Sequence, residues 1–295
     1  MEKMSGIFPV LQTPIDAAGE IDVDDLKKEV AFCIEAGAHG LVFPVLGSEF
    51  QYLTEEERGR SVDLVVGEAG GQVPVVAGVA GTSQQAAEVC ARQAAAAGAD
   101  AVIALPPYIA GPTPEQVRDY YIAIARIVER PVFIQHTAGG LTPKLMAEMF
   151  ASEEHILYLK EEAPPSAHQI SAVQGQITEG CLGIFAGAHS RWMMSELHRG
   201  ATGFIPAVEG IDVHVQIWDA YQAGDEAGAR ALFNRLLPQI NLILLLGLKV
   251  CKEVLMRRGV FKSSAMRMPG DHPFDADDAR ELDAILEDLR PLHRV

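Results

Sequence analysis

Short apolar runs alternate with longer segments of helical periodicity along most of the chain. Short, continuous apolar runs are typical of parallel strands that are buried on both faces. Two of the intervening segments, 22–37 and 82–98, end at a glycine, which readily adopts the left-handed conformation that follows a helix. The candidate strands lie at 6–11, 40–45, 74–78, 101–105, 131–135, 156–160, 182–186 and 202–206.

Eight strands that alternate with helices predict an α/β fold, a (βα)8 TIM barrel. The alternative is a doubly wound open sheet, but the glycine-rich GxGxxG turn typical of dinucleotide-binding sheets is absent from the sequence. After residue 225 only helical periodicity continues. We therefore expect a barrel domain over residues 1–225 and a C-terminal helical extension over 226–295, packed on the barrel.

Composition argues against several classes of function. The 295 residues are 48% hydrophobic, enough for a large core, and the formal net charge of −16 makes nucleic acid an improbable partner. The longest apolar run, 242–248, is too short to cross a bilayer, so we expect no membrane partner. The four cysteines form no CxxC pair and the N-terminus has no signal-peptide pattern, which indicates reduced thiols in a cytoplasmic protein.

The stretch ILYLKEE at 156–162 ends a predicted core strand on a lysine, Lys160. Barrel enzymes place their chemistry at the C-terminal ends of the strands. An amine among apolar side chains loses its proton more readily and can then attack a ketone to form a Schiff base. The alternative is a strand-end lysine that pairs with Glu161 or Glu162. Position and composition alone leave both interpretations open.

Four stretches together resemble the dihydrodipicolinate synthase/N-acetylneuraminate lyase family: YLKEE (158–162), VLGSEFQYLTEEER (45–58), LPPY (105–108) and PVFIQ (131–135). The resemblance covers nearly the whole chain. It implies a (βα)8 barrel that forms a homo-oligomer, a dimer or a tetramer of two tight dimers. It also implies a Schiff base between a 2-oxo acid, often pyruvate, and the lysine of strand six, which Lys160 matches.

The family's carboxylate-binding stretch after strand two, G-T/S-T-G-E, is altered at 45–49. Leu46 lacks the hydroxyl that relays protons in the family. Ser48 and the amides of Gly47 and Ser48 are suited to bind the substrate carboxylate, because backbone N–H groups in a turn attract anions; alternatively, Ser48 caps the turn. Glu49 keeps its place, either as an acid or base or as a structural partner of this loop.

The family's strand-five tyrosine, which transfers protons, is replaced by Gln135. An amide forms hydrogen bonds but is no general acid. The neighbouring imidazole, His136, can transfer protons, although alternation along a strand turns it away from the barrel axis if Gln135 points inward. The tyrosine of LPPY, Tyr108, matches one that reaches across the tight-dimer interface. The arginine that recognises the second substrate of dihydrodipicolinate synthases has no counterpart in 137–140.

Within the family, the SE pair, PPY and the strand-five glutamine resemble the 2-keto-3-deoxy-sugar-acid dehydratases, in particular the L-2-keto-3-deoxyarabonate type. Three further residues are expected at the barrel mouth: Gly187, which leaves room for substrate; Ile205, which packs over the imine; and His189, which either contacts a substrate hydroxyl or lies in a surface loop. The histidines show no metal-binding spacing, so we expect no metal and no organic cofactor.

The resulting hypothesis is a Schiff-base lyase, a dehydratase or aldolase of a 2-keto-3-deoxy sugar acid. Lys160, Gln135, Tyr108 and Glu49 are its candidate catalytic residues, and Gly47, Ser48, Gly187, Ile205 and His136 its candidate substrate-binding residues. The alternatives are a dihydrodipicolinate synthase that condenses pyruvate with an aldehyde, an imino-acid deaminase, and a non-catalytic barrel that binds a 2-oxo acid.

Overall fold

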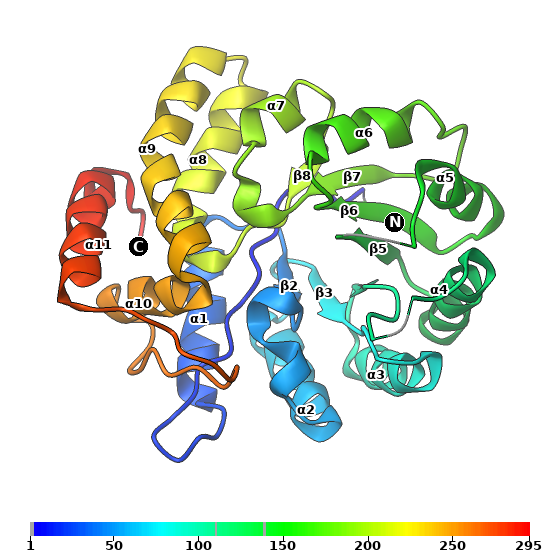
Figure 1. The fold of residues 1–295 in the computed structure, drawn as a ribbon, viewed down its shortest axis with the longest axis horizontal. Coiled ribbons are helices and arrows are strands. Elements are labelled where there is room, and N and C mark those ends of the chain that lie inside the picture. The colour runs from blue at the N-terminus through cyan, green and yellow to red at the C-terminus, as the bar shows by residue number, and fades with distance from the viewer. Residues whose placement is uncertain (1–2, 110, 138–139) are drawn as a thin grey trace.

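The computed structural model describes residues 3–109, 111–137 and 140–295. One sheet of eight parallel strands runs in the order β1-β8-β7-β6-β5-β4-β3-β2, and a parallel bridge between Val10 and Val42 links the two ends (Figure 1). The predicted barrel is therefore confirmed. The strands are β1 (Gly6–Ile7), β2 (Leu41–Phe43), β3 (Val75–Gly78), β4 (Ala101–Ala104), β5 (Val132–His136), β6 (Ile156–Glu161), β7 (Gly183–Ala186) and β8 (Gly203–Phe204).

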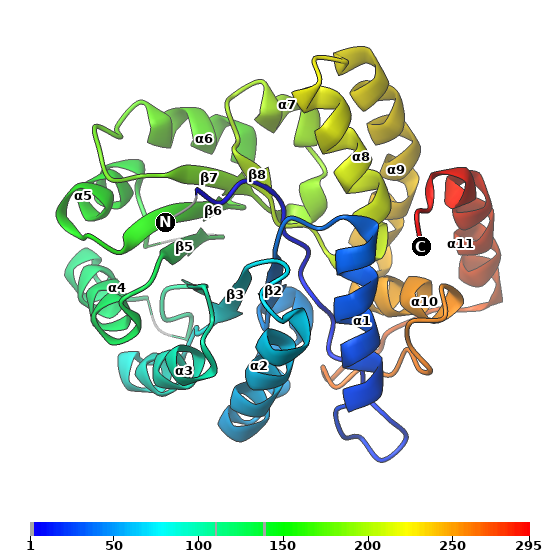
Figure 2. The same cartoon turned by 180° about the vertical axis from the view of Figure 1, so that it is seen from behind.

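Helices follow the strands and surround the sheet, as both views of the ribbon show (Figure 2). Their ends are set by local sequence: Thr54 and Glu57 form a capping box, and Gly37 and Gly98 end their helices with positive φ angles of 96° and 81°. The helices are α1 (Val23–Ala36), α2 (Glu55–Ala69), α3 (Gln84–Ala97), α4 (Pro114–Val128), α5 (Pro143–Ser152), α6 (Ser166–Gln174), α7 (Met193–Leu197) and α8 (Ile211–Gln222).

The core has two layers, one between the sheet and the helices and one inside the barrel. The rings of Phe133 and Tyr158 stack inside the barrel with centroids 4.5 Å apart, and Phe185 packs edge-on against Phe133 at 5.3 Å. Because side chains alternate along a strand, the residue two positions after Tyr158 also points inward. That residue is Lys160, which therefore lies above the aromatic rings of Phe133, Tyr158 and Phe185.

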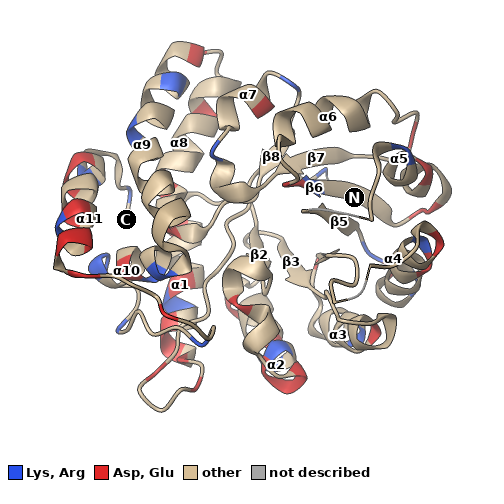
Figure 3. Cartoon of the chain, viewed as in Figure 1, with Lys and Arg blue, Asp and Glu red and all other residues tan. Residues whose placement is uncertain are grey.

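Three more helices form the C-terminal extension: α9 (Glu226–Leu246), α10 (Leu248–Arg257) and α11 (Ala276–Leu289). The extension packs on the barrel chiefly where α9 lies along α8 and where α10 meets the short η4 helix (Val208–Gly210) that follows β8. A division of the chain at residue 225 stays a prediction. Charged side chains lie mainly on the outer helices and loops (Figure 3). Among the described residues, no helix combines the length and apolar character needed to cross a membrane.

Candidate active site

Lys160 lies at the C-terminal end of β6, inside the barrel, and is 3% exposed. The strand register places it beside Gln135 of β5 on one side and Phe185 of β7 on the other. Its Nζ lies 2.8 Å from Oε1 of Glu162, directly beyond the strand. The amine thus has apolar side chains around it and also pairs with Glu162, so the two interpretations that the sequence left open are both met in part.

Glu162 is held by three donors. Besides the Lys160 ammonium, its carboxylate accepts hydrogen bonds from Nε2 of Gln135 at 2.8 Å and from the backbone N–H of Ala188 at 3.2 Å. Burial acts to raise the pKa of this carboxyl, but the charge of Lys160 and the hydrogen bonds outweigh it and hold the pKa below its ordinary value. Glu162 is thus a carboxylate fixed against the candidate nucleophile.

Sequence reasoning considered Glu162 only as an ion-pair partner of a strand-end lysine. The structure supports that pairing and also places the pair inside a cavity. The signal for a functional role is that Glu162 lies two positions after Lys160, at the mouth of the barrel.

Gly187 lies at the end of β7, against Glu162. A Cβ atom at this position would lie 2.2 Å from Oε1 of Glu162, which no real contact allows. The expectation that Gly187 leaves room for substrate is therefore corrected: the room it leaves is filled by the Glu162 carboxylate.

A cavity of about 200 Å³ opens above Lys160. It brings together three of the candidate residues, Lys160, Gly47 and Ile205, with Glu162 and His189. Gln135 reaches the same site only through its hydrogen bond to Glu162. The lining residues are Val10, Leu46, Gly47, Lys160, Glu162, Ala188, His189, Ile205, Ala207 and Leu248.

His136 points to the opposite side of β5 from Gln135, as strand alternation predicts. Its Nδ1 lies 2.9 Å from Oε2 of Glu161, and both side chains are buried in the layer between the sheet and the helices. Its assignment to substrate binding is therefore corrected, because His136 does not line the cavity.

Ser48 belongs to the short η1 helix (Leu46–Ser48), and its polar groups are used within the loop. Its hydroxyl donates to the Leu11 carbonyl at 2.6 Å and accepts from the Val45 N–H at 3.2 Å. Its own N–H donates to the Val45 carbonyl at 2.8 Å. The assignment of Ser48 to carboxylate binding gives way to the alternative of a turn cap, whereas Gly47 lines the cavity.

Glu49 faces the C-terminal extension and does not line the cavity. Its carboxylate lies 2.5 Å from Nζ of Lys252 on α10 and accepts the backbone N–H groups of Arg267 and Met268 at 2.9 and 2.6 Å. Burial lowers the pKa of Lys252, although the Glu49 carboxylate opposes this shift. These contacts favour the alternative of a structural partner over a catalytic Glu49.

The sequence model described as "Dihydrodipicolinate synthetase family" matches residues 3–289. The chain belongs to this family. As a family member it is a lyase, and the predicted resemblance is confirmed.

Named relatives of this lyase include different activities. It is 31% identical to an L-2-keto-3-deoxyarabonate dehydratase from Azospirillum brasilense, over 97% of this chain and 95% of the relative. It is 29% identical to a probable 2-dehydro-3-deoxy-D-pentonate aldolase from Escherichia coli, over 80% and 81% of the two chains. The crystal structure of a dihydrodipicolinate synthase from Rhodopseudomonas palustris superposes with a TM-score of 0.88, at 26% identity, and covers 97% and 98% of the chains.

Tyr108 of this family member lies outside the cavity and is 43% exposed. Its ring packs edge-on against Phe50 with centroids 5.9 Å apart. Its expected place at a tight-dimer interface stays a prediction. In the segment 137–140, where the synthase arginine has no counterpart, residues 138–139 lie outside the described residues.

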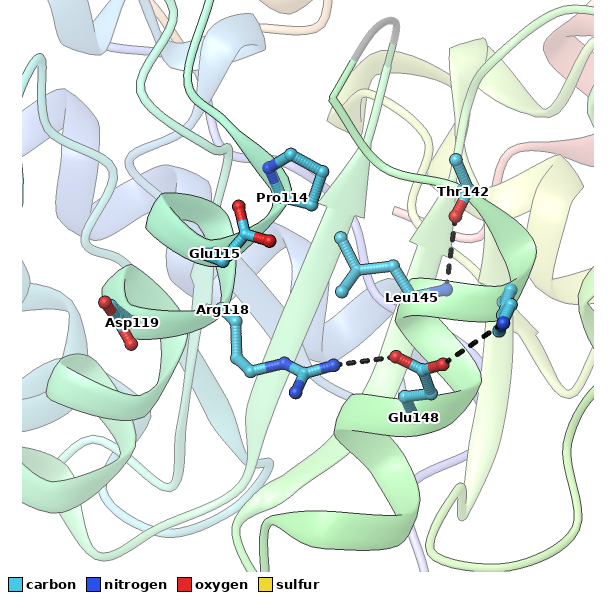
Figure 4. Close-up of a pocket in the computed structure, with 8 residues that line it drawn as sticks. Pro114, Glu115, Arg118, Asp119, Thr142, Leu145 and Glu148 are labelled. Carbon is cyan, nitrogen blue, oxygen red and sulfur yellow. Dashed lines mark hydrogen bonds and ion pairs between the residues drawn. The ribbon is translucent and has the colours of Figure 1, made fainter.

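A second, larger depression of about 370 Å³ lies between α4 and α5 of this lyase (Figure 4). Arg118 crosses it to Glu148 at 2.7 Å, and Lys144 lies 3.9 Å from the same carboxylate. These charged side chains are 41–80% exposed, so water screens them strongly. The depression has no buried nucleophile in its lining, and the chemistry therefore points to the smaller cavity at Lys160.

Proposed function

We propose that this lyase forms an imine between Lys160 and the C2 carbonyl of a 2-keto-3-deoxy sugar acid and then eliminates the β-hydroxyl as water. The observation that carries the proposal is a buried amine inside a cavity with a fixed carboxylate 2.8 Å away. A nucleophilic amine beside a base is the arrangement that covalent catalysis requires.

The carboxylate of Glu162, beside the Lys160 amine, is the group suited to the first proton transfer. Glu162 accepts a proton from the Lys160 ammonium, and the free amine attacks the carbonyl. The carbinolamine loses water to give a protonated imine, which withdraws electrons from C3. Loss of a C3 proton gives an enamine, and its electron pair expels the C4 hydroxyl, which leaves with a proton as water. Hydrolysis of the imine then restores the amine and releases the unsaturated 2-oxo acid.

The chain's departures from the family pattern favour elimination over condensation. Leu46 and Gln135 replace the hydroxyl-bearing residues that relay protons in the synthases. Gln135 instead donates to Glu162 and holds it against the lysine. The dehydratase relative at 31% identity supports the same substrate class. Aldol cleavage of the same acids is the second candidate, supported by the aldolase relative.

We propose further that the reaction needs no organic cofactor, because the imine itself is the electron sink. We also propose that Tyr108, exposed beside Phe50, packs against a second copy of the chain. Light scattering on the wild-type protein and on Tyr108→Ala tests whether Tyr108 contributes to an oligomer. A monomer in both samples would contradict it.

The decisive experiment traps the imine. The protein is incubated with pyruvate and, separately, with 2-keto-3-deoxy acids, then reduced with borohydride and digested for peptide mass spectrometry. We expect a stable mass gain on the peptide that contains Lys160, and none in Lys160→Ala. The exposed Lys144→Ala variant is the matched control and should trap normally. Absence of an adduct with every acid would refute the lyase mechanism and leave a 2-oxo-acid-binding barrel.

Analysis of the products then distinguishes elimination of water from aldol cleavage. Elimination yields an unsaturated or rearranged acid with the full carbon chain. Aldol cleavage yields pyruvate and an aldehyde. Release of pyruvate from a 2-keto-3-deoxy acid would replace the dehydratase proposal with the aldolase.

A further inference from the structure

Three metal-ligating side chains that are far apart in the sequence meet beside the cavity. His189 lies in the η3 helix (Ala188–Ser190) after β7, Glu209 in η4 after β8, and Cys251 in α10 of the extension. One donor atom from each side chain lies within 4.8 Å of the other two. The cluster shares only His189 with the cavity above Lys160.

The cluster is buried and incompletely satisfied. Glu209 is 3% exposed and Cys251 fully buried. Oε2 of Glu209 and Nδ1 of His189 have no hydrogen-bond partner among the residues that the structure describes. A buried polar atom without a partner is unfavourable, so an arrangement of this kind calls for a further partner. The Cys251 thiol already hydrogen-bonds to the Glu209 carboxyl group, and either a hydrogen-bond donor or a cation would satisfy the remaining oxygen.

The three types of ligand atom indicate which metal ion would bind. An imidazole nitrogen, a thiolate and a carboxylate oxygen are the ligands that zinc prefers. The thiolate and the carboxylate together balance the charge of a divalent ion. Bond lengths of about 2.0–2.3 Å place tetrahedral ligand atoms roughly 3.5 Å apart, so modest side-chain rotations would close the set around an ion.

The surrounding charges are also compatible with a cation. Burial raises the pKa of the fully buried Glu29 well above its ordinary value, and the Glu209 carboxyl group adds to that shift, so Glu29 places no fixed charge beside the cluster. The neighbouring ammonium of Lys252 is directed to Glu49, at 2.5 Å. The positive charge of Lys252, which follows Cys251 in the sequence, is therefore paired with Glu49.

We propose that His189, Glu209 and Cys251 bind one divalent metal ion of the zinc class. The ion would tie α10 of the extension to the two loops at the mouth of the barrel. Three protein ligands leave a fourth coordination position for water or another small ligand. The sequence-based expectation of no metal relied on local spacing, which cannot reveal ligands that come from three separate elements. The proposal is independent of the imine chemistry at Lys160.

Metal binding by the wild-type chain is the first test. The full-length protein is treated with a chelator, dialysed against Zn²⁺ and analysed by elemental mass spectrometry; a parallel sample receives Co²⁺. We expect one ion per chain and, with Co²⁺, a near-ultraviolet charge-transfer band from thiolate ligation. Binding of less than about a tenth of an ion per chain, or a Co²⁺ spectrum without that band, would overturn the proposal.

Variants assign the ligands. Cys251→Ser and Glu209→Gln should each weaken Zn²⁺ binding by more than about tenfold. Cys90→Ser removes a buried thiol outside the cluster, and His198→Gln removes a partly exposed histidine; both are matched controls and should bind as the wild type does. Zn²⁺ should raise the melting temperature of the wild type but not of Cys251→Ser. Unchanged binding in a folded Cys251→Ser variant would reject the site. If that variant does not fold, the Co²⁺ spectrum of the wild-type protein is the test of the site.

Discussion

The contact between Lys160 and Glu162 combines two opposing requirements. A carboxylate 2.8 Å from an amine stabilises the ammonium form, whereas attack on a carbonyl needs the free amine. The same carboxylate resolves the conflict if it takes the proton as the substrate enters. The hydrogen bonds from Gln135 and Ala188 fix the position of Glu162, so the proton has a short and defined path.

Glu162→Gln tests this role. The amide keeps the shape of the side chain but cannot take up the proton, so we expect kcat with the 2-keto-3-deoxy acid to fall by about 10²–10⁴-fold. Borohydride should still trap pyruvate on Lys160, but more slowly. Steady-state kinetics and the rate of trapping measure both effects. Glu148→Gln on the outer surface is the control, and a wild-type kcat in Glu162→Gln would remove Glu162 from the mechanism.

Gly187→Ala tests the packing behind that carboxylate. A methyl group 2.2 Å from Oε1 of Glu162 must push the carboxylate away from Lys160. Overpacking of this kind costs about 1–3 kcal/mol, and activity should fall with it. Gly67→Ala is the matched control, because a Cβ there, on helix α2, meets no atom within 4 Å and should stabilise the helix by up to about 1 kcal/mol. Urea denaturation compares the two, and equal stabilities would contradict the clash.

At the scale of elements, the sequence pattern predicted the features that depend on neighbouring residues in the chain. The strands, the glycines that end helices and the opposite directions of Gln135 and His136 follow from patterns of a few residues. The partner of Glu49 could not be predicted, because Lys252 lies 203 residues away and only the docked extension brings the two together. The cluster of His189, Glu209 and Cys251 could not be predicted for the same reason, because only the folded chain brings these three residues together.

Lys252→Met measures how firmly the extension is held on the barrel. The substitution leaves Glu49 buried without its ammonium partner, and loss of one member of a buried pair costs about 3–5 kcal/mol. The N–H groups of Arg267 and Met268 still solvate the carboxylate, so we expect the lower end of that range. The free energy of unfolding in urea gives the value, with the exposed Lys144→Met as control. A loss below about 1 kcal/mol would show that the pair contributes little.

At the scale of the whole molecule, buried acids link folding to pH. Glu196 on α7 is fully buried, and its Oε1 accepts the Ser166 hydroxyl at 2.5 Å. Burial raises the pKa of Glu196 to about 7, well above its ordinary value of 4.5. The folded state therefore binds a proton that the unfolded chain has already released between these two values.

The sign of the effect on stability follows from that difference. The contribution of a carboxyl whose pKa is raised by folding is fully present below about pH 4.5 and is lost as the pH rises through about 7. Glu196→Gln removes this titration, so the free energy of unfolding of the variant should decrease less between pH 5 and pH 8 than that of the wild type. The difference should be at most about 3 kcal/mol. Urea denaturation at a series of pH values measures it, with Glu148→Gln as the exposed control. Parallel pH profiles of the wild type and Glu196→Gln would show that this acid is ionised in the folded protein at neutral pH.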